Sequence, residues 1–216
     1  MKKSTLRILT VLLVAGLAAP FLHAGANVLL YPFARMFGAP SEAELAKCRV
    51  AYAEFRATLG TRPIRVAPVL WKDGPKGTWS RPIAEALARE LRASTSAPVM
   101  VEPGKPDVPA PDFGHNQLKY LWARGAEYAA WRRAAPPLDG YMLCAEVWGH
   151  HGKVGAIQVY VFDAKGQIAY CRLYNSHQFG DNLPLEPDEP LRLIVRHLFE
   201  DLQKKPEEAF PPYGVG

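Results

Sequence analysis

The chain has 216 residues, of which 49% are hydrophobic and 22% are charged. This composition provides for a hydrophobic core and excludes an intrinsically disordered protein, and the length suits one domain with short appendages. The formal net charge is +5, but Lys2, Lys3 and Arg7 lie in the first 26 residues, which contain no acid. The rest of the chain is therefore nearly neutral and gives no basic surface for binding nucleic acid.

The first 26 residues have the layout of a secretory signal. A basic segment, 1–7, precedes an apolar run over 8–22, and small residues follow at 24–26. This layout predicts cleavage after Ala26 and a periplasmic or secreted location for the remaining chain.

An uncleaved membrane anchor facing the periplasm is the alternative interpretation of the same segment. Residues 9–30 would just reach the roughly 20 apolar residues that a bilayer core requires. Pro20, His23 and Asn27 interrupt that run and favour the cleaved signal. Contact with a membrane is predicted only if the segment is retained.

A helix, an α/β domain and a tail are predicted in that order after the signal. Segment 27–60 contains a helix that opens with a capping box, in which Ser41 and Glu44 satisfy each other's backbone amides. Segment 61–205 forms the domain, and 206–216 is a flexible tail without periodicity. The domain's expected strands are 64–71, 97–102, 141–148, 154–162 and 167–175, and its expected helices are 82–91, about 116–133 and 191–202.

The alternation of these elements predicts a single α/β domain with α+β character. Its mixed sheet has about five strands, ends in an antiparallel meander, and carries helices packed on it. Pro68 lacks an amide donor, so the first strand must lie at an edge or bulge there. The segment 72–78 is expected to be a loop.

Asp163 and Gly166 delimit a type I turn between the last two strands. If the turn sets the register, Val159 lies opposite Cys171. The side chains of Tyr160, Tyr170 and Tyr174 then share one face of the hairpin.

Three cysteines leave at least one thiol unpaired within a monomer. Cys144 and Cys171 are expected on the outer strands of the meander, about two strand spacings apart, which is too far for a disulfide. Cys48 lies on the apolar stripe of the first helix and could pair with either Cys144 or Cys171.

No sequence motif for phosphate binding, dinucleotide binding, serine hydrolysis or zinc binding occurs in the chain. His150 and His151 in a turn and His177 at a strand end are the candidate ligands or acid–base groups of an alternative metal-dependent or thiol/histidine enzyme. The simpler interpretation is a polar turn with inert, buried thiols. The sequence predicts no cofactor and no catalytic residue, and it leans against an enzyme.

The expected binding residues surround the first strand's carboxyl end, where open α/β sheets often bind ligands. Trp71, Lys72, Trp79 and Arg81 lie there. If these side chains are exposed, they suit contact with a protein or a glycan. The alternative is that the tryptophans fill the core beneath the loop.

Three segments of the domain resemble an arrangement known from the cell envelope. They are IRVAPVLW (64–71), PIAEALAREL (82–91) and VYVFDAKGQIAY (159–170). They resemble the TolB amino-terminal domain and the CsgG-type secretion lipoproteins. The chain departs from these lipoproteins in having no cysteine near the cleavage site and a Pro-rich connector from Pro103 to Pro111.

The resemblance implies a mixed sheet with packed helices, no catalytic machinery, and interaction with other proteins in the periplasm. Together with the export signal, it predicts a non-enzymatic binding or assembly protein of a bacterial-type cell envelope, with an envelope protein as its partner. A membrane-tethered structural protein remains an alternative.

Overall fold

A computed structural model describes residues 40–73, 76–108, 117–180 and 182–210. The predicted signal or anchor lies outside these residues. Among the described residues, no helix combines the length and the apolar character needed to cross a membrane.

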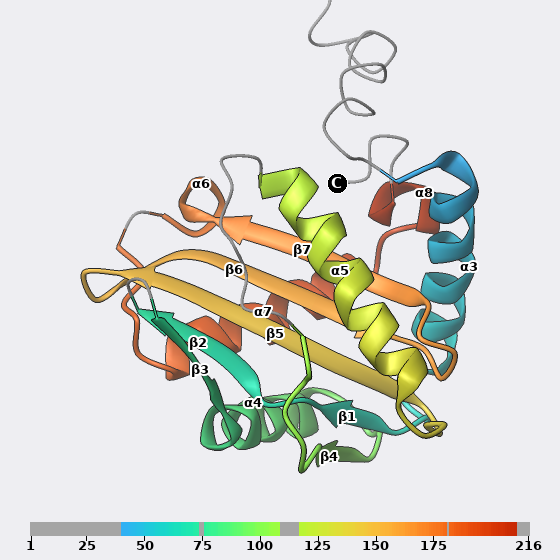
Figure 1. The fold of residues 1–216 in the computed structure, drawn as a ribbon, viewed down its shortest axis with the longest axis horizontal. Helices are drawn as coiled ribbons and strands as arrows, with labels where there is room; N and C mark the ends of the chain where they lie inside the picture. The colour runs from blue at the N-terminus through green and yellow to red at the C-terminus, as the bar shows by residue number, and fades with distance from the viewer. Residues whose placement is uncertain (1–39, 74–75, 109–116, 181, 211–216) are drawn as a thin grey trace, which may run out of the picture.

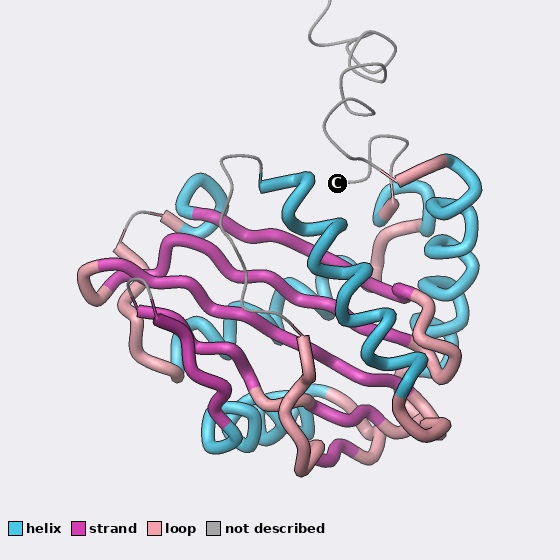
Figure 2. Tube along the Cα trace, in the orientation of Figure 1, coloured by secondary structure: helices cyan, strands magenta, loops and turns pink. Residues whose placement is uncertain are grey.

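One mixed sheet forms the centre of the molecule (Figures 1 and 2). Strands β5 (Tyr141–His150), β6 (Lys153–Phe162) and β7 (Ile168–Asn175) form the antiparallel meander. The other edge of β5 pairs in parallel with β1 (Ile64–Val66) at one end and with β2 (Val69–Asp73) at the other. Beyond these lie β4 (Val99–Val101), parallel to β1, and β3 (Lys76–Ser80), antiparallel to β2. The predicted mixed sheet is confirmed, with seven strands among the described residues.

Pro68 explains why the predicted first strand is divided into β1 and β2. Val66 pairs with Leu143 and Leu70 with Glu146, so four steps along one strand match three along β5. The extra residue is the β-bulge that the proline's missing amide requires. The predicted loop at 72–78 instead belongs largely to the β2–β3 hairpin, and this hairpin and the division of the first strand raise the strand number above five.

Helices cover both faces of the sheet. Helix α5 (Gln117–Ala134) crosses one face, while α4 (Arg81–Ser94) and α7 (Asp188–Asp201) lie on the other (Figure 1). Helix α3 (Glu42–Thr58) runs beside β7, and its predicted capping box between Ser41 and Glu44 is present. The short helix α6 (Ser176–Phe179) follows β7.

The end of the described chain is packed against the domain, unlike the flexible tail predicted for 206–216. Residues Pro206–Ala209 form helix α8, and Phe210 is only 1% exposed. The ring of Phe210 contacts Tyr52 of α3 and Trp122 of α5. Its carbonyl oxygen accepts a 2.9 Å hydrogen bond from Arg49 Nε. Residues 211–216 lie outside the described part.

The predicted register of the last hairpin is wrong by one residue. Gly166 has φ +74°, and the turn amides bond to Asp163 as expected of the predicted turn. However, Phe162 pairs with Ile168 and Val161 with Tyr170, so Ala169 is bulged. Cys171 consequently lies opposite Tyr160, and not opposite Val159.

The bulge also separates the tyrosines that were expected on one face. Tyr160 lies on the α5 face, where its hydroxyl donates to the carbonyl oxygen of Leu121. Tyr170 and Tyr174 lie on the α7 face, where their hydroxyls bond to Asp201.

A buried ion pair fastens α5 to the sheet. Glu146 on β5 is fully buried, and its carboxylate accepts hydrogen bonds from Arg124 Nε and the Tyr128 hydroxyl, both at 2.6 Å. Trp148 Nε1 donates to the same carboxylate at 3.2 Å. We call Glu146, Arg124, Tyr128 and Trp148 the Glu146 cluster.

A second buried carboxylate, Asp201, connects β7, α7 and α3. It accepts from Arg172 Nε at 2.7 Å and from Lys204 Nζ at 2.6 Å. The hydroxyl of Tyr52, on α3, donates to the Asp201 carbonyl oxygen. Glu146 thus fastens α5 to the sheet, and Asp201 connects α3 and α7 to β7.

Gly140, just before β5, lies in a conformation that only glycine adopts easily. Its φ is +100°, and an added Cβ would lie 2.0 Å from the Pro63 carbonyl oxygen, which accepts the Tyr141 amide. We expect Gly140→Ala to lower the free energy of unfolding by at least about 2 kcal/mol. Urea unfolding followed by tryptophan fluorescence measures this.

Gly152 is the matched control for that substitution. It also has positive φ, +72°, but no described atom lies within 4 Å of an added Cβ. Gly152→Ala should therefore cost only the conformational penalty, about 1 kcal/mol. Equal losses in the two variants would contradict the close approach at Pro63.

Candidate functional site

The structure does not bring the four predicted binding residues together. Leu70 pairs with Trp79 and Trp71 with Thr78 across the β2–β3 hairpin, so the two tryptophans point to opposite faces of the sheet. Both are partly buried and pack against the core.

Lys72 and Arg81 each have a partner within the molecule. Lys72 Nζ lies 4.1 Å from the centroid of the Trp148 ring, on the α5 face. Arg81 Nε lies 3.2 Å from Glu85 Oε1 within α4. With Trp71 and Trp79, they form no single binding surface.

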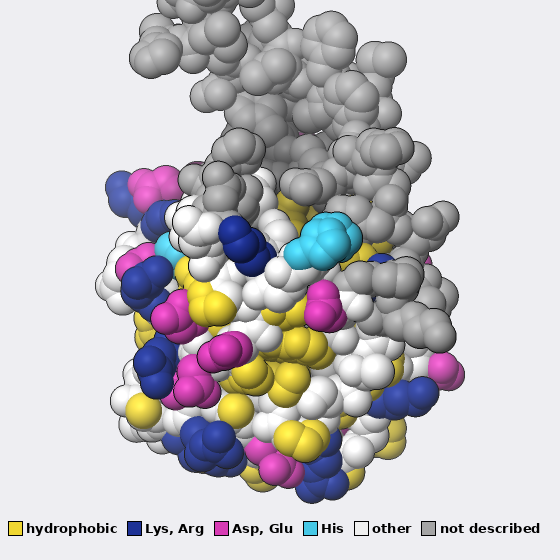
Figure 3. Space-filling model, turned by 90° about the vertical axis from the view of Figure 1, so that its left-hand side faces the viewer, with side chains coloured by type: hydrophobic (Ala, Val, Ile, Leu, Met, Phe, Trp, Pro, Cys, Tyr) yellow, Lys and Arg dark blue, Asp and Glu magenta, His cyan; other side chains and the backbone are white. Residues whose placement is uncertain are grey.

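The predicted histidine candidates lie at one end of the sheet. His150 and His151 are exposed at the β5–β6 turn, and their ring centroids are 3.8 Å apart. His177 belongs to α6, and its side chain is outside the described part. Figure 3 views this end of the molecule, where hydrophobic, acidic and basic side chains are interspersed around a group of histidine side chains. Among the described residues, no three His, Cys, Asp or Glu side chains gather in a way that could hold a metal ion.

The three cysteines are buried and free, so neither disulfide considered for Cys48 is formed. Cys144 and Cys171 each pair with Tyr160 from opposite sides, which confirms that one strand separates them. Burial raises the pKa of the Cys48 thiol to about 12, and it raises the pKa values of Cys144 and Cys171 as well. All three thiols are therefore protonated, and poor nucleophiles, at neutral pH.

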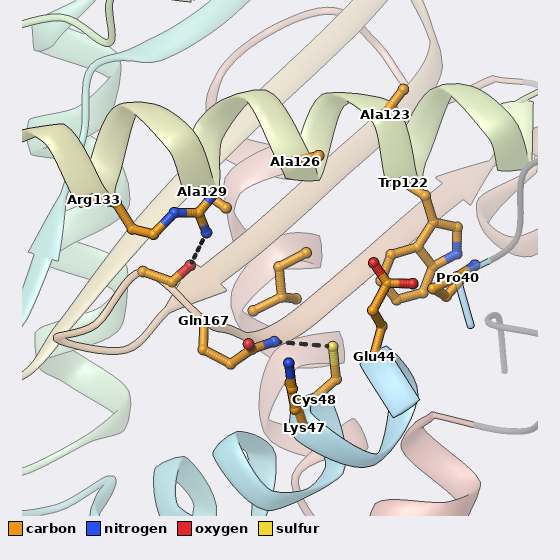
Figure 4. A pocket seen from close by; sticks show the side chains of 12 residues that line it. Pro40, Glu44, Lys47, Cys48, Trp122, Ala123, Ala126, Ala129, Arg133 and Gln167 are labelled. Carbon is orange, nitrogen blue, oxygen red and sulfur yellow. Dashed lines mark hydrogen bonds between the residues drawn. The ribbon is translucent and has the colours of Figure 1, made fainter. Parts of the chain in front are cut away.

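A hollow that the sequence does not predict lies between α3 and α5. Two adjoining hollows of about 510 and 520 Å³ share Lys47, Arg133 and Gln167 in their walls. Figure 4 shows the first hollow, with α5 above, the start of α3 below and the β6–β7 turn at the side. We call both hollows together the α3–α5 groove. Its apolar lining includes Ala46, Cys48, Val50, Trp122, Ala123, Ala126 and Ile168.

Small side chains on α5 make the groove possible. Ala123, Ala126 and Ala129 recur at every third position and leave room between the helix and α3. Trp122 closes one end, where it contacts Phe210. Gln167 lies at the base and donates a 3.4 Å hydrogen bond to Cys48 Sγ.

Val50 is the most exposed large hydrophobic residue of the described chain. Its exposed fraction is 70%, and it lines the groove from α3. An apolar side chain at such a position loses contact with water when a partner covers it, which favours association.

The acidic and basic side chains that line the groove differ in their partners within the chain. Of the three acidic groups, Glu54 pairs with Arg62. Glu44 and Asp163 accept hydrogen bonds from neutral donors, the hydroxyl and amide of Ser41 and two turn amides, and keep their negative charge. The Ser41 hydrogen bonds lower the pKa of Glu44, and Lys47 contributes to this lowering. The three basic groups are Lys47, Arg133 and Lys165, and no ion pair joins them to a carboxylate among the described residues. The groove therefore places three basic side chains that form no ion pair with a described residue beside an apolar floor.

Comparisons with known proteins identify no family for this chain. No protein-family model matches it, and no curated protein is significantly similar to it. One similar solved structure is the C-terminal domain of LpoB from Salmonella enterica, with 11% identity and a TM-score of 0.33, covering 59% of this chain and 96% of that chain. Another is a dodecamer of a PelC variant from Paraburkholderia phytofirmans, with 13% identity and a TM-score of 0.28, covering 71% and 88%. At these TM-scores the similarity decides neither the fold nor the function of this chain.

Proposed function

We propose that this protein is an exported, non-enzymatic binding or assembly protein of the cell envelope. In this proposal, the α3–α5 groove holds an acidic segment of a partner protein that also carries apolar side chains. The predicted export signal supports the compartment, and the groove supports the binding surface.

The observation that carries the proposal is the combination, in one groove, of exposed Val50 with basic groups that form no ion pair within the described chain. The lining of small and apolar residues accepts side chains of moderate size, and Lys47, Arg133 and Lys165 can attract carboxylates on the same segment. Charge complementarity of this kind accelerates association and selects partners. The high pKa values of the buried thiols support binding over thiol chemistry.

Site-specific cross-linking tests the proposal in cells of the source organism. A photoreactive amino acid replaces Val50 in the full-length protein, and after irradiation the attached peptide is identified by mass spectrometry. We expect one reproducible adduct with a peptide from another exported protein, in which acidic and apolar residues lie close together.

The matched control places the same photoreactive group at Ala93. This residue is exposed on α4, on the opposite face of the sheet, and it should give no such adduct. The proposal is wrong if Val50 gives no adduct, if both positions give the same adducts, or if Val50 attaches only to residues 27–39 of its own chain.

A further inference from the structure

The turn between β5 and β6 holds two exposed histidines in an uncommon backbone conformation. His150 ends β5 and pairs with Lys153 at the start of β6, so His151 and Gly152 alone form the turn. Both turn residues have positive φ, +52° at His151 and +72° at Gly152. Positive φ at both positions is typical of a type I′ turn, whose first position usually holds asparagine, aspartate or glycine. Among the described residues, His151 is the one residue other than glycine with positive φ.

The two imidazole rings lie against each other at this turn. In an extended strand, consecutive side chains point to opposite faces of the sheet. Here the ring centroids of His150 and His151 are only 3.8 Å apart, and the ring planes are inclined by 55°. Positive φ costs a residue other than glycine about 1–2 kcal/mol, and residues held in such conformations cluster at functional sites. The conformation of His151 therefore calls for a functional reason.

The segment that precedes α7 holds the backbone of this turn. The amide of Leu185 donates a 2.9 Å hydrogen bond to the carbonyl oxygen of Gly152, and the amide of Val154 donates one of the same length to the carbonyl oxygen of Leu183. The turn is thus fixed by the tertiary fold, while both imidazole side chains remain exposed to solvent.

Both imidazoles are available to a ligand from solvent. Within the described part of the chain, no residue forms a hydrogen bond or an ion pair with either ring, and the contact of the two rings is with each other. His197 on α7 differs, because its Nδ1 lies 3.0 Å from Glu200 Oε2. Imidazole nitrogens are the commonest protein ligands of transition metals.

From this geometry we infer that His150 and His151 together bind one Cu²⁺ ion. Among the divalent ions of the first transition row, Cu²⁺ binds a given nitrogen site most tightly, and it prefers a tetragonal set of nitrogen and oxygen ligands. The two imidazoles supply the nitrogens, and water supplies the oxygens. Because both rings are exposed, rotation about their side-chain bonds can direct one nitrogen of each toward the ion. The site needs no third side chain, and none of the described His, Cys, Asp or Glu residues completes a group of three there.

This site is separate from the α3–α5 groove. The β5–β6 turn and the β6–β7 turn, which forms part of the groove, lie at opposite ends of β6 (Figure 1). Neither His150 nor His151 lines the groove. Binding of Cu²⁺ therefore does not depend on the function proposed for the groove.

Titration of the full-length protein with Cu²⁺ tests the inference, using protein purified without a polyhistidine tag. Calorimetry should show that the tightest site holds one ion per chain. Pulsed electron paramagnetic resonance at one equivalent of Cu²⁺ should show two imidazoles bound to the ion. Zn²⁺ should bind to the same site more weakly than Cu²⁺.

His151→Asn removes one ligand and keeps the turn, because asparagine adopts positive φ readily. We expect the affinity for Cu²⁺ to fall at least about tenfold, since even the loss of a residue that only hydrogen-bonds to a metal ligand costs about 10–100-fold. The resonance spectrum should then show one imidazole, and urea unfolding should show no loss of stability. His150→Gln, at the last residue of β5, should weaken binding to the same extent.

His197→Gln is the matched control, because it removes an imidazole that belongs to α7 and faces Glu200. It should leave the affinity and the spectrum unchanged. The inference is overturned if no Cu²⁺ binds at one equivalent, if the spectrum shows fewer than two imidazoles, or if either variant of the pair binds Cu²⁺ as tightly as wild type. Tighter binding of Zn²⁺ than of Cu²⁺, or an equal loss in His197→Gln, would also overturn it.

Discussion

Replacing Glu146 with alanine is expected to lower the free energy of unfolding by about 3–5 kcal/mol. The substitution leaves the Arg124 guanidinium, whose side chain is 1% exposed, without its buried carboxylate. It also removes the acceptor that Tyr128 and Trp148 use. Urea unfolding at neutral pH measures the loss.

Glu127→Ala is the matched control, because Glu127 is the other carboxylate that pairs with Arg124. Its side chain is 41% exposed, so its removal should cost less than about 1 kcal/mol. Replacing Arg124 and Glu146 together by methionine and leucine should cost less than Glu146→Ala alone, since no charge is left unpaired. If Glu146→Ala costs no more than Glu127→Ala, the Glu146 cluster does not fasten α5 to the sheet.

Replacing Asp201 with alanine is expected to cost a similar amount, about 3–5 kcal/mol at neutral pH. Arg172, which is 4% exposed, would then lack its buried partner. Burial by itself raises the pKa of Asp201, but hydrogen bonds from Arg172 and Lys204 outweigh burial and lower the pKa below its usual value.

The lowered pKa predicts how this loss depends on pH. A carboxylate whose pKa is lower in the folded state stabilises the fold above its unfolded-state pKa, about 3.9, and loses this effect as the pH falls through the folded-state value. The difference in stability between wild type and Asp201→Ala should therefore be constant from pH 7 to about pH 5 and shrink below about pH 4. The lowered pKa of Glu44 is common to both proteins and cancels in the difference.

Urea unfolding of both proteins at pH 7, 5, 4 and 3 provides the measurement. Asp188→Ala, at an exposed position in the first turn of α7, serves as the control and should change stability little at every pH. A loss for Asp201→Ala that stays constant down to pH 3 would show that the carboxylate is not held in its ionised form by Arg172 and Lys204.

Local sequence signals predicted the elements and their ends well where the responsible physics is local. The Ser41 capping box starts α3, and Ser80 accepts the amide of Ile83 at the start of α4. The missing amide of Pro68 correctly indicated an edge or a bulge, because it removes one particular hydrogen bond. These features depend on residues a few positions apart.

The fold prediction was wrong where pairing between strands decides the structure. Segment Lys76–Ser80 has a glycine and no hydrophobic alternation, yet it forms β3 because β2 offers it a free edge. The turn at Asp163–Gly166 was identified, but the bulge at Ala169 was not. That single residue moved Cys171 to the other face and separated the tyrosines.

The candidate site was missed for a related reason. Lys47 and Val50 lie on α3, Ala126 and Arg133 on α5, and Gln167 in the β6–β7 turn, so only the tertiary fold brings them together. Two signals were present in the sequence: the repeated alanines of α5, and Val50, which lies off the apolar stripe of α3. The binding site was instead predicted around Trp71 and Trp79 of β2 and β3, because large aromatic side chains often lie in interfaces.

Charge reversal in the α3–α5 groove tests most directly whether the groove recognises an acidic segment of a partner. Lys47→Glu and Arg133→Glu are introduced together into the protein that carries the photoreactive group at Val50. The control carries Arg89→Glu and Lys105→Glu, which change the net charge equally at exposed positions outside the groove. We expect the partner adduct to fall at least about tenfold in the groove variant and to persist in the control. An undiminished adduct in the groove variant would contradict the account.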